Sequence, residues 1–317
     1  EKGNRKTGSQ GSASDTGYRT LKSRNMVKTS VVILNWNGKK LLEQFLPAVL
    51  AHSLSEECSV IVADNGSTDD SVEFLTTNYP VISLIILDKN YGFAEGYNKA
   101  IQQVDSQYVV LLNSDVEVSE NWLSTLVSYM DEHSDTVAVQ PKIRSFRHRE
   151  QFEYAGAAGG FIDRFAYPFC RGRILEDVEN DEGQYDSIIP IFWATGACLC
   201  IRRNEYLEAG GLDAGFFAHM EEIDLCWRLN TRGYKIECVP SSVVFHVGGA
   251  SLNKENPHKT YLNFRNNLLM IYKNVPRGKL FSILSIRFIL DFAACLHLLL
   301  NGKFENARSV IKAQSDF

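Results

Sequence analysis

The chain has 317 residues, of which 44% are hydrophobic and 22% are charged, and its formal net charge is −5. This balance is that of a folded globular protein and excludes a disordered or fibrous chain. The net charge is mildly negative and does not indicate the basic surface that binds nucleic acids, so we expect no nucleic-acid partner. The length accommodates one large α/β domain or two smaller ones.

Residues 1–25 are polar and rich in Gly, Ser, Lys and Arg, without the apolar run of a secretory signal. We predict that they form a disordered tail and that Met26, just before the first apolar run, is the natural start. The seven cysteines include no C-x-x-C pair. We therefore interpret them as reduced, mostly buried thiols of a cytoplasmic protein rather than as a zinc or redox site.

Strand-like and helix-like runs alternate in the first half of the chain. Apolar strand runs occupy residues 31–34, 59–63, 82–87 and 108–112, and helical spacing occurs at 39–51, 72–77 and 93–104. Such alternation predicts a parallel sheet with right-handed crossovers, which binds ligands beyond the carboxyl ends of its strands. Polar clusters at 35–38, 64–69 and 113–115 fall at that edge, which we predict to be the ligand site.

The second half is less regular. We expect loops or a hairpin insertion at 142–187, strands within 188–202, at 235–239 and at 243–245, and helices at 221–231 and 257–272.

Residues 280–300 form a strongly apolar helical stretch that Arg287, Asp291 and His297 interrupt. A membrane span needs about 20 apolar residues, and charges near its centre are costly. We therefore predict that this helix packs on the protein or lies on the cytoplasmic membrane surface. Arg287 and Asp291 are one turn apart and could pair.

Two strand-end clusters contain candidate ligand residues. A carboxylate at Asp64 could accept the N3–H of uracil or thymine, or could form a capping turn. Asp115, at the end of Asn113-Ser114-Asp115, could bind Mg²⁺ or Mn²⁺ that bridges to a diphosphate, although a capping turn explains it equally well.

The segment from Asn90 to Asn98 begins a helix, and its Gly92 and Gly96 allow close backbone approach at a helix N-terminus that favours an anion. It is not a G-x-G-x-x-G fingerprint, and no phosphate-binding P-loop motif occurs in the sequence. These observations argue against a dinucleotide enzyme and against a P-loop ATPase.

Three carboxylates, Glu221, Glu222 and Asp224, begin a predicted helix. They could compensate the helix dipole or supply the general base that inverting attack by a hydroxyl requires. His246 ends a strand beside a Gly-Gly turn, as a structural residue or as a metal ligand. Trp193 is either a platform for an acceptor or a core residue.

Together these segments resemble the family 2 glycosyltransferases of the GT-A fold, especially their rhamnosyltransferase-like members. The resemblance covers residues 29–273 and rests on seven motifs in order: VVILNWNG (31–38), ADNGSTDDS (63–71), NYGFAEGYN (90–98), LLNSD (111–115), GGLD (210–213), EEIDLCWR (221–228) and HVGGAS (246–251). It implies a Rossmann-like, mostly parallel sheet flanked by helices, followed by a C-terminal helical segment.

The resemblance also implies roles for individual residues. By this resemblance, Asp64 recognises the pyrimidine base of the donor, Asp115 and His246 bind Mn²⁺ or Mg²⁺, and Glu222 is the catalytic base. The donor site further includes Asn35, Asn90, Gly96, Asn98 and Asn113, and the acceptor or supporting residues are Trp193, Glu221, Asp224 and Arg228. Two departures stand out: Asn113 replaces the first Asp of the D-x-D motif, and Glu222 stands where Asp is usual.

The resulting hypothesis is an inverting transfer from a UDP- or dTDP-sugar, such as dTDP-rhamnose, to a glycan or lipid-linked acceptor in cell-envelope polysaccharide synthesis. We expect a tail at 1–25, a catalytic domain at 26–275 and a C-terminal helical, membrane-associated segment at 276–317, located at the inner face of the cytoplasmic membrane. Two alternatives stay open: a nucleotidyltransferase, for which Lys39 and Lys40 follow the first strand, and an inactive nucleotide- or glycan-binding homologue. The sequence leaves the oligomeric state open.

Overall fold

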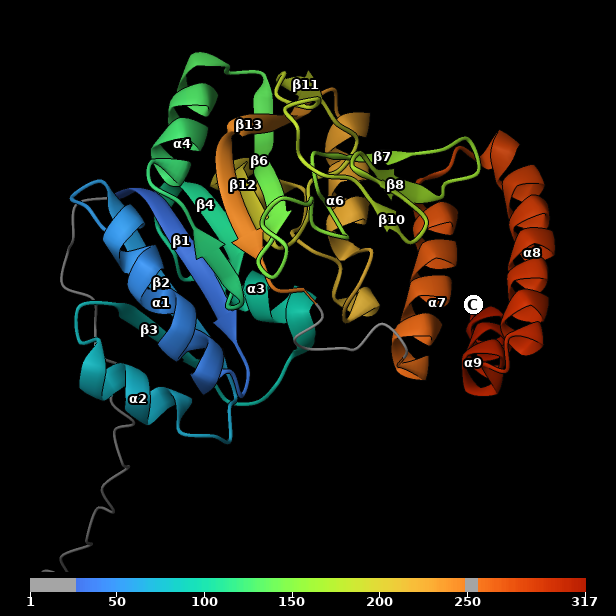
Figure 1. Ribbon diagram of the computed structural model, residues 1–317, viewed down its shortest axis with the longest axis horizontal. Helices are drawn as coiled ribbons and strands as arrows, with labels where there is room; N and C mark the ends of the chain where they lie inside the picture. The colour runs from blue at the N-terminus through green and yellow to red at the C-terminus, as the bar shows by residue number, and fades with distance from the viewer. Residues whose placement is uncertain (1–26, 249–255) are drawn as a thin grey trace, which may run out of the picture.

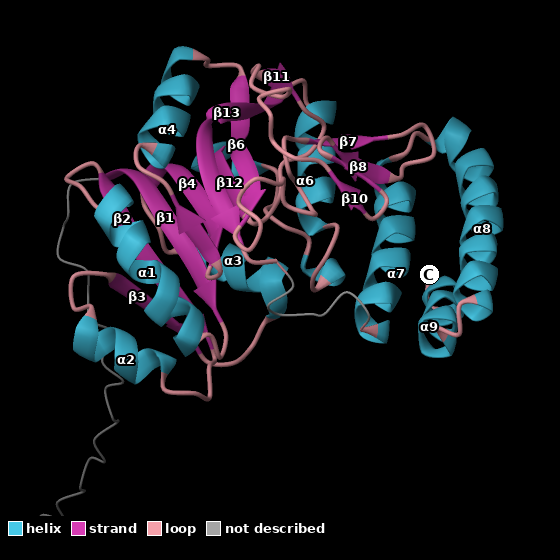
Figure 2. Cartoon of the chain, viewed as in Figure 1, coloured by secondary structure: helices cyan, strands magenta, loops and turns pink. Residues whose placement is uncertain are grey.

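The computed structural model describes residues 27–248 and 256–317. The predicted tail and the end of the 246–251 motif lie outside these residues. Within them, nine strands form one sheet with helices on both faces, in the order β11-β13-β6-β12-β4-β1-β2-β3, with β5 paired to β13 (Figures 1 and 2). The mixed α/β architecture with a central, mostly parallel sheet confirms the predicted fold class.

The first half of the chain builds the predicted alternating unit. Its elements are β1 (Val27–Asn35), α1 (Lys39–Ser53), β2 (Cys58–Asn65), α2 (Ser71–Asn78), β3 (Ser83–Leu87), α3 (Gly92–Gln102) and β4 (Ser106–Asn113). The pairs β1–β2, β1–β4 and β2–β3 are all parallel.

The apolar run of β1 is buried on both faces, as a continuous β-branched strand predicts. Val31 and Ile33 pack in a core cluster with Leu46 of α1, whereas Val32 packs in a second cluster with Tyr97 of α3. The sheet therefore separates two hydrophobic cores. Because both faces of the sheet are covered, a ligand can reach β1, β2 and β4 only at their ends.

The second half extends the sheet with β5 (Val116–Val118), α4 (Trp122–Glu132), β6 (Thr136–Ser145), β12 (Cys198–Arg202), α5 (Arg203–Glu208), η1 (Ala214–Phe216), α6 (Glu221–Thr231) and β13 (Lys235–His246). The two strands expected at 235–239 and 243–245 are one strand, β13. Its pairing with β6 shifts register between Val239 and Val243. Pro240 lies in this interval and lacks a backbone N–H for the ladder, which explains the irregularity.

The segment expected as loops or hairpins from residue 142 begins four residues later, because β6 continues to Ser145. Beyond it are small two-stranded sheets, β7 (Gly160–Ile162) with β8 (Pro168–Cys170) and β9 (Arg173–Ile174) with β10 (Asp177–Val178), and then β11 (Ile189–Pro190). All seven cysteines are buried and free.

Three helices end the chain: α7 (Pro257–Asn274), α8 (Arg277–Leu300) and α9 (Phe304–Ser315). They lie beside one another at the end of the molecule away from β3 (Figure 1). By length and composition, α8 is the one helix among the described residues that is long and apolar enough to cross a membrane, although little of it is buried.

Candidate active site

Polar residues that end β1, β2 and β4 lie side by side at one edge of the sheet. Asn35 of β1 stands opposite Asp64 of β2, and Leu34 stands opposite Asn113 of β4. These are the carboxyl ends of parallel strands, where open α/β sheets bind ligands. The structure thus brings together three residues that the sequence assigned to the donor site.

Asp64 is buried and fixes the loop that follows β2. Its Oδ1 accepts the backbone N–H of Ser67 at 2.9 Å, and its Oδ2 accepts Nδ2 of Asn35 at 2.9 Å. A carboxylate has about four lone-pair sites, so acceptor capacity remains. The Oδ1 of Asn35 is buried and has no hydrogen-bond partner among the described residues, which leaves a polar atom for a ligand.

Asn65, which the sequence analysis did not single out, fastens the loop between β3 and α3. Its Nδ2 donates to Asn90 Oδ1 at 3.1 Å and to the Gly92 carbonyl at 2.9 Å, while its Oδ1 accepts the N–H of Tyr91 at 3.0 Å. Asn90 Oδ1 also accepts the N–H of Gly92 at 2.8 Å. Asn65 belongs to a cluster whose composition indicates a turn, so no separate signal marked it.

Asp115 and His246 meet because β5 pairs with β13. His246 stands opposite Val116, and the N–H of Val247 donates to the Asp115 carbonyl at 3.1 Å. The Nε2 of His246 lies 3.1 Å from Asp115 Oδ1, and Nδ2 of Asn113 lies 3.5 Å from the same nitrogen. The two residues predicted as metal ligands are therefore adjacent, at the strand-end edge.

Glu153 completes this cluster on the far side of the imidazole. Its Oε1 lies 3.6 Å from His246 Nδ1, and its Oε2 accepts the N–H of Ala155. A Cβ at Gly248 (φ +68°) would lie 2.9 Å from Glu153 Oε1, so the chain can pass here only as glycine. Glu153 lies in a segment without a motif, and only the tertiary contact reveals it.

The two carboxylates determine the charge of His246. Burial alone would lower the pKa of its imidazole, but the hydrogen bond with Asp115 and the contact with Glu153 outweigh burial and raise the pKa to about 10. At neutral pH the imidazole therefore carries a proton on both ring nitrogens. Binding of a metal at Nε2 requires the neutral ring and releases one of these protons.

Glu221 and Glu222, at the start of α6, differ in exposure. Glu221 is only 4% exposed, whereas Glu222 keeps accessible surface. Burial, with the neighbouring Glu222, raises the pKa of Glu221 well above its usual range. Burial also raises the pKa of Glu222, but backbone N–H groups, including that of Gly196, oppose the shift. Glu222 is therefore the less buried of the two carboxylates, and its buried Oε2 has no hydrogen-bond partner among the described residues.

The segment before β12 links Glu222 to the strand-end edge. The N–H of Asn113 donates to the Ala197 carbonyl at 3.0 Å. One residue earlier, a Cβ at Gly196 would lie 4.0 Å from Cβ of Glu222. A carboxylate that can act as a base thus lies close to the loop of the candidate metal ligands, an arrangement suited to acid–base chemistry beside a cation.

Comparison with known proteins identifies the family. The model of glycosyl transferase family 2 matches residues 30–187. The chain belongs to glycosyl transferase family 2. It is 27% identical over 239 residues to an N-acetylglucosaminyl-diphospho-decaprenol L-rhamnosyltransferase of Mycobacterium tuberculosis, covering 71% of this chain and 78% of that protein. It is 23% identical over 163 residues to the rhamnosyltransferase WbbL of Escherichia coli, covering 49% of this chain and 61% of that protein.

Solved structures support the GT-A fold of this family 2 glycosyltransferase. The crystal structure of GalNAc-T7 with UDP, GalNAc and Mn²⁺ matches with a TM-score of 0.60 at 16% identity, over 79% of this chain and 48% of that one. At this identity the match establishes the fold alone. The expected rhamnosyltransferase-like family and GT-A fold are thus confirmed.

In this glycosyltransferase, Asn266 of α7 fixes the segment that leads into the acidic pair. That segment contains three non-glycine residues with positive φ, at +64°, +70° and +76°: Phe217, His219 and Met220. Such backbone persists only where the surroundings hold it. The buried Nδ2 of Asn266 lies 2.9, 2.8 and 2.8 Å from the carbonyl oxygens of Phe216, Ala218 and His219.

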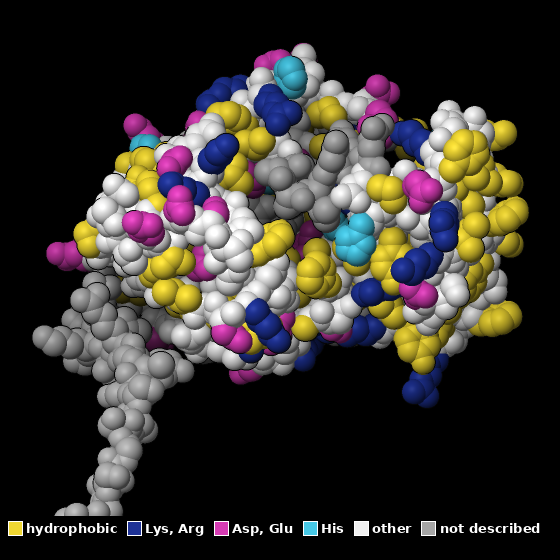
Figure 3. Space-filling view, turned by 90° about the horizontal axis from the view of Figure 1, so that it is seen from below, with side chains coloured by type: hydrophobic (Ala, Val, Ile, Leu, Met, Phe, Trp, Pro, Cys, Tyr) yellow, Lys and Arg dark blue, Asp and Glu magenta, His cyan; other side chains and the backbone are white. Residues whose placement is uncertain are grey.

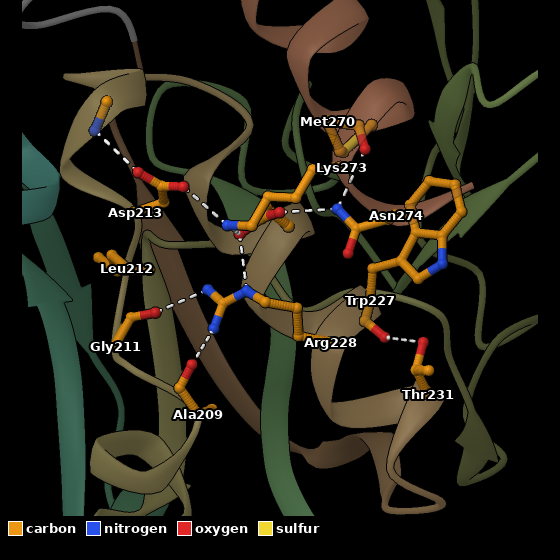
Figure 4. A network of polar contacts seen from close by, with 12 residues as sticks. Ala209, Gly211, Leu212, Asp213, Trp227, Arg228, Thr231, Met270, Lys273 and Asn274 are labelled. Atoms are coloured by element: carbon orange, nitrogen blue, oxygen red, sulfur yellow. Dashed lines mark hydrogen bonds and ion pairs between the residues drawn. The ribbon is translucent and has the colours of Figure 1, made fainter. Parts of the chain in front are cut away.

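Asp224 and Arg228 lie in a polar network that joins α6 to α7 and to the chain before η1 (Figure 4). Arg228 donates to Asp224 at 2.8 Å and to the Gly211 carbonyl at 2.7 Å. The fully buried Asp224 also accepts Nζ of Lys273 at 2.8 Å and Nδ2 of Asn274 at 2.7 Å. With its hydrogen bonds made inside the protein, the pair supports the position of α6.

Asn98 and Gly96, assigned to the donor site, are engaged in packing. Oδ1 of Asn98 accepts the hydroxyl of Tyr206 at 2.6 Å and the N–H of Leu212 at 3.0 Å. A Cβ at Gly96 would lie 3.0 Å from Asn65 Nδ2 and from the methyl groups of Leu34. Both residues hold α3 against its neighbours, because helix and sheet approach closely here.

Trp193 is a core residue in this structure. Its indole N–H donates to the Phe161 carbonyl at 2.8 Å, and the side chain is buried. A Cβ at Gly160 would lie 2.1 Å from the indole ring. The ring is therefore packed against backbone, which favours the core interpretation over an acceptor platform.

Proposed function

We propose that this family 2 glycosyltransferase transfers a sugar, with inversion at the anomeric carbon, from a UDP- or dTDP-sugar to a hydroxyl of a glycan or lipid-linked acceptor. The observation that carries the proposal is the contact between Asp115 and His246 at the strand-end edge. Glu222 supports it, because this carboxylate lies beside Gly196, in the segment that accepts a hydrogen bond from Asn113. The names of the relatives support a rhamnosyl donor, and that of the Mycobacterium tuberculosis relative supports a lipid-linked acceptor. The donor that we propose is accordingly dTDP-rhamnose, and the setting that we propose is cell-envelope polysaccharide synthesis at the cytoplasmic face of the membrane.

Asp115 and His246 fit a divalent cation, Mn²⁺ or Mg²⁺. They offer one carboxylate oxygen and one imidazole nitrogen that face each other. In residues 27–248 and 256–317, no group of three or more His, Cys, Asp or Glu side chains is arranged as a closed metal site. When held by Asp115 and His246, such a cation would supply charge neutralisation for the departing nucleoside diphosphate.

Glu153 positions His246 for this task. Ligating histidines commonly donate their second ring N–H to a carboxylate, which fixes the tautomer and the ring orientation. Nδ1 of His246 lies 3.6 Å from Glu153 Oε1 and has no hydrogen-bond partner among the described residues. A hydrogen bond formed there on metal binding would leave the lone pair of Nε2 for the cation beside Asp115. Glu153 is thus a positioning residue for the metal ligand.

Glu222 acts as the general base. Its carboxylate takes the proton of the acceptor hydroxyl while that oxygen bonds to the anomeric carbon and the bond from that carbon to the diphosphate breaks. Burial beside a second carboxylate raises the pKa of Glu221 well above its usual range, which makes Glu221 the poorer candidate for an ionised base. Asn35, Asp64, Asn90 and Asn113 then face the donor nucleotide, with Asp64 nearest the pyrimidine.

The two alternatives make different demands on the same site. A nucleotidyltransferase would use Lys39 and Lys40 on phosphates, but Nζ of Lys39 lies 3.5 Å from Asp70 and 4.0 Å from Glu43 at the surface. An inactive binding homologue would bind the donor without cleaving it. Neither alternative requires a general base at Glu222.

Donor hydrolysis without acceptor tests the proposal. Purified protein is incubated with dTDP-rhamnose, UDP-sugars or GDP-sugars and Mn²⁺, and the released nucleoside diphosphate is measured. We expect release of dTDP or UDP in preference to GDP. Binding without release supports the inactive homologue, and release of pyrophosphate from a nucleoside triphosphate supports the nucleotidyltransferase.

A further inference from the structure

The outward side of α8 carries large, exposed apolar side chains along its length. They are from 39% to 88% exposed, and we call them the apolar face of α8: Phe281, Ile289, Phe292, Leu296, Leu299 and Leu300. Hydrophobic side chains gather along the edge of the molecule that α8 forms, at the right of Figure 3. Together these six side chains expose apolar surface on the order of 500 Å². A contiguous apolar patch of this size on a folded protein marks an interaction site.

The two charged residues in the middle of α8 point toward the protein instead. Arg287 and Asp291 are buried, lie 3.4 Å apart and form the predicted pair. The guanidinium of Arg287 lies 3.6 Å from the ring centroid of Tyr167, whose hydroxyl donates to Asp291 at 3.1 Å. Arg287 also donates to Asn267 of α7 and to the Ala166 carbonyl. These contacts fasten the inner side of α8 to α7 and to the turn between β7 and β8.

Basic residues surround the apolar face. Residues 257–317 contain nine Lys and Arg but three Asp and Glu, whereas the whole chain has a net charge of −5. Arg277 and Lys279 at the start of α8, and Lys303 just beyond its end, are exposed. An apolar face flanked by cations complements a bilayer surface with anionic head groups.

We propose that α8 lies flat on an anionic phospholipid surface, with its apolar face in the boundary between head groups and acyl chains. The helix has 24 residues. At 1.5 Å per residue it presents about 36 Å of length to that surface. In a transmembrane orientation, Arg287 and Asp291 would lie in the hydrocarbon core of the bilayer and would lose their contacts with Tyr167 and Asn267. A second copy of the chain on this face would bring two basic segments together.

This inference goes beyond the proposed function, because it does not depend on which nucleotide the donor site binds. Flotation with vesicles tests it. We expect the protein to float with vesicles of phosphatidylcholine mixed with phosphatidylglycerol, to bind vesicles of phosphatidylcholine alone more weakly, and to be released by salt. Phe292→Glu should weaken binding to the anionic vesicles by about tenfold or more.

The matched control is Ile86→Glu, a charge placed on an equally exposed side chain of β3, at the other end of the molecule (Figure 1). It should float like the unchanged protein. Circular dichroism and donor hydrolysis in solution should be unchanged in both variants, which shows that they fold.

Three outcomes overturn the proposal. The first is that the unchanged protein fails to float while it still hydrolyses donor, a result that leaves the proposed function intact. The second is a dimer in light scattering that Phe292→Glu converts to monomer without any vesicle binding, because a second copy then covers the face. The third is protein that resists alkaline carbonate extraction, because the helix then spans the bilayer.

Discussion

Replacement of Asn266 by alanine tests how the fold positions the acidic pair. The variant removes an amide that reaches three carbonyl oxygens at 2.8–2.9 Å. One amide has two N–H groups, so about two hydrogen bonds are lost, each contributing roughly 0.5–1.5 kcal/mol, and buried carbonyls are left without partners. We expect the free energy of unfolding to fall by about 2–4 kcal/mol, which lowers Tm by roughly 4–12 °C.

The same variant should impair transfer more than its stability predicts. The residues at +64°, +70° and +76° relax once the amide is gone, and they lead directly into Glu221 and Glu222. A misplaced base costs rate rather than donor affinity, so kcat should fall by about tenfold to a hundredfold with the Kd for nucleotide nearly unchanged.

The matched control is Asn230→Ala, which removes a 2.8 Å bond to the Phe192 carbonyl at the other end of α6. Thermal unfolding and initial rates below Tm are measured for both. An Asn266→Ala enzyme whose kcat equals that of Asn230→Ala would refute the reasoning.

Further predictions concern the site itself. Glu222→Gln should lower transfer by about 10²–10⁴-fold with donor binding intact, whereas Glu221→Gln should retain more activity; the reverse order in a rate assay would move the base to Glu221. The acid limb of the pH profile of kcat/KM should lie above the usual carboxylate range, because burial raises the pKa of Glu222, and a limb near pH 4 would contradict this. Burial raises the pKa of Glu221 in the folded protein above its unfolded value of about 4.3. Glu221 therefore contributes its full stabilisation at a pH below the unfolded pKa, and this stabilisation is lost as pH rises through the folded pKa. Glu221→Gln should therefore raise Tm at pH 8 but not at pH 4. Glu153→Gln should weaken Mn²⁺ binding by about 10–100-fold in calorimetry of the nucleotide-loaded protein, and an unchanged affinity would remove its positioning role.

The sequence predicted the parts of the fold that follow from local pattern. Residues 31–33 of the first apolar run are buried on both faces of the sheet, and Asn35, Asp64 and Asn113 lie adjacent because parallel strands end at one edge. Arg287 and Asp291 pair because they are one helical turn apart. In each case the period of the element determines the geometry.

Residues whose roles depend on distant contacts could not be predicted in this way. Glu153 and Asn266 lie in segments without motifs, and their partners are more than 40 residues away in the chain. Motif membership was also insufficient: Asn98 stands in a family motif, yet its amide binds Tyr206 and Leu212. The motif preserves the packing of α3, which neighbours the donor edge.

The central claim is that Asp115 and His246 hold a divalent cation for a pyrimidine nucleotide. Calorimetric titration of dTDP and UDP into the protein, with Mn²⁺ and with EDTA, tests it most directly. We predict binding that requires Mn²⁺, that exceeds binding of GDP, and that Asp115→Ala weakens at limiting Mn²⁺ while Glu222→Gln does not. Equal binding of dTDP, UDP and GDP, or binding that persists in EDTA and in Asp115→Ala, would contradict the claim.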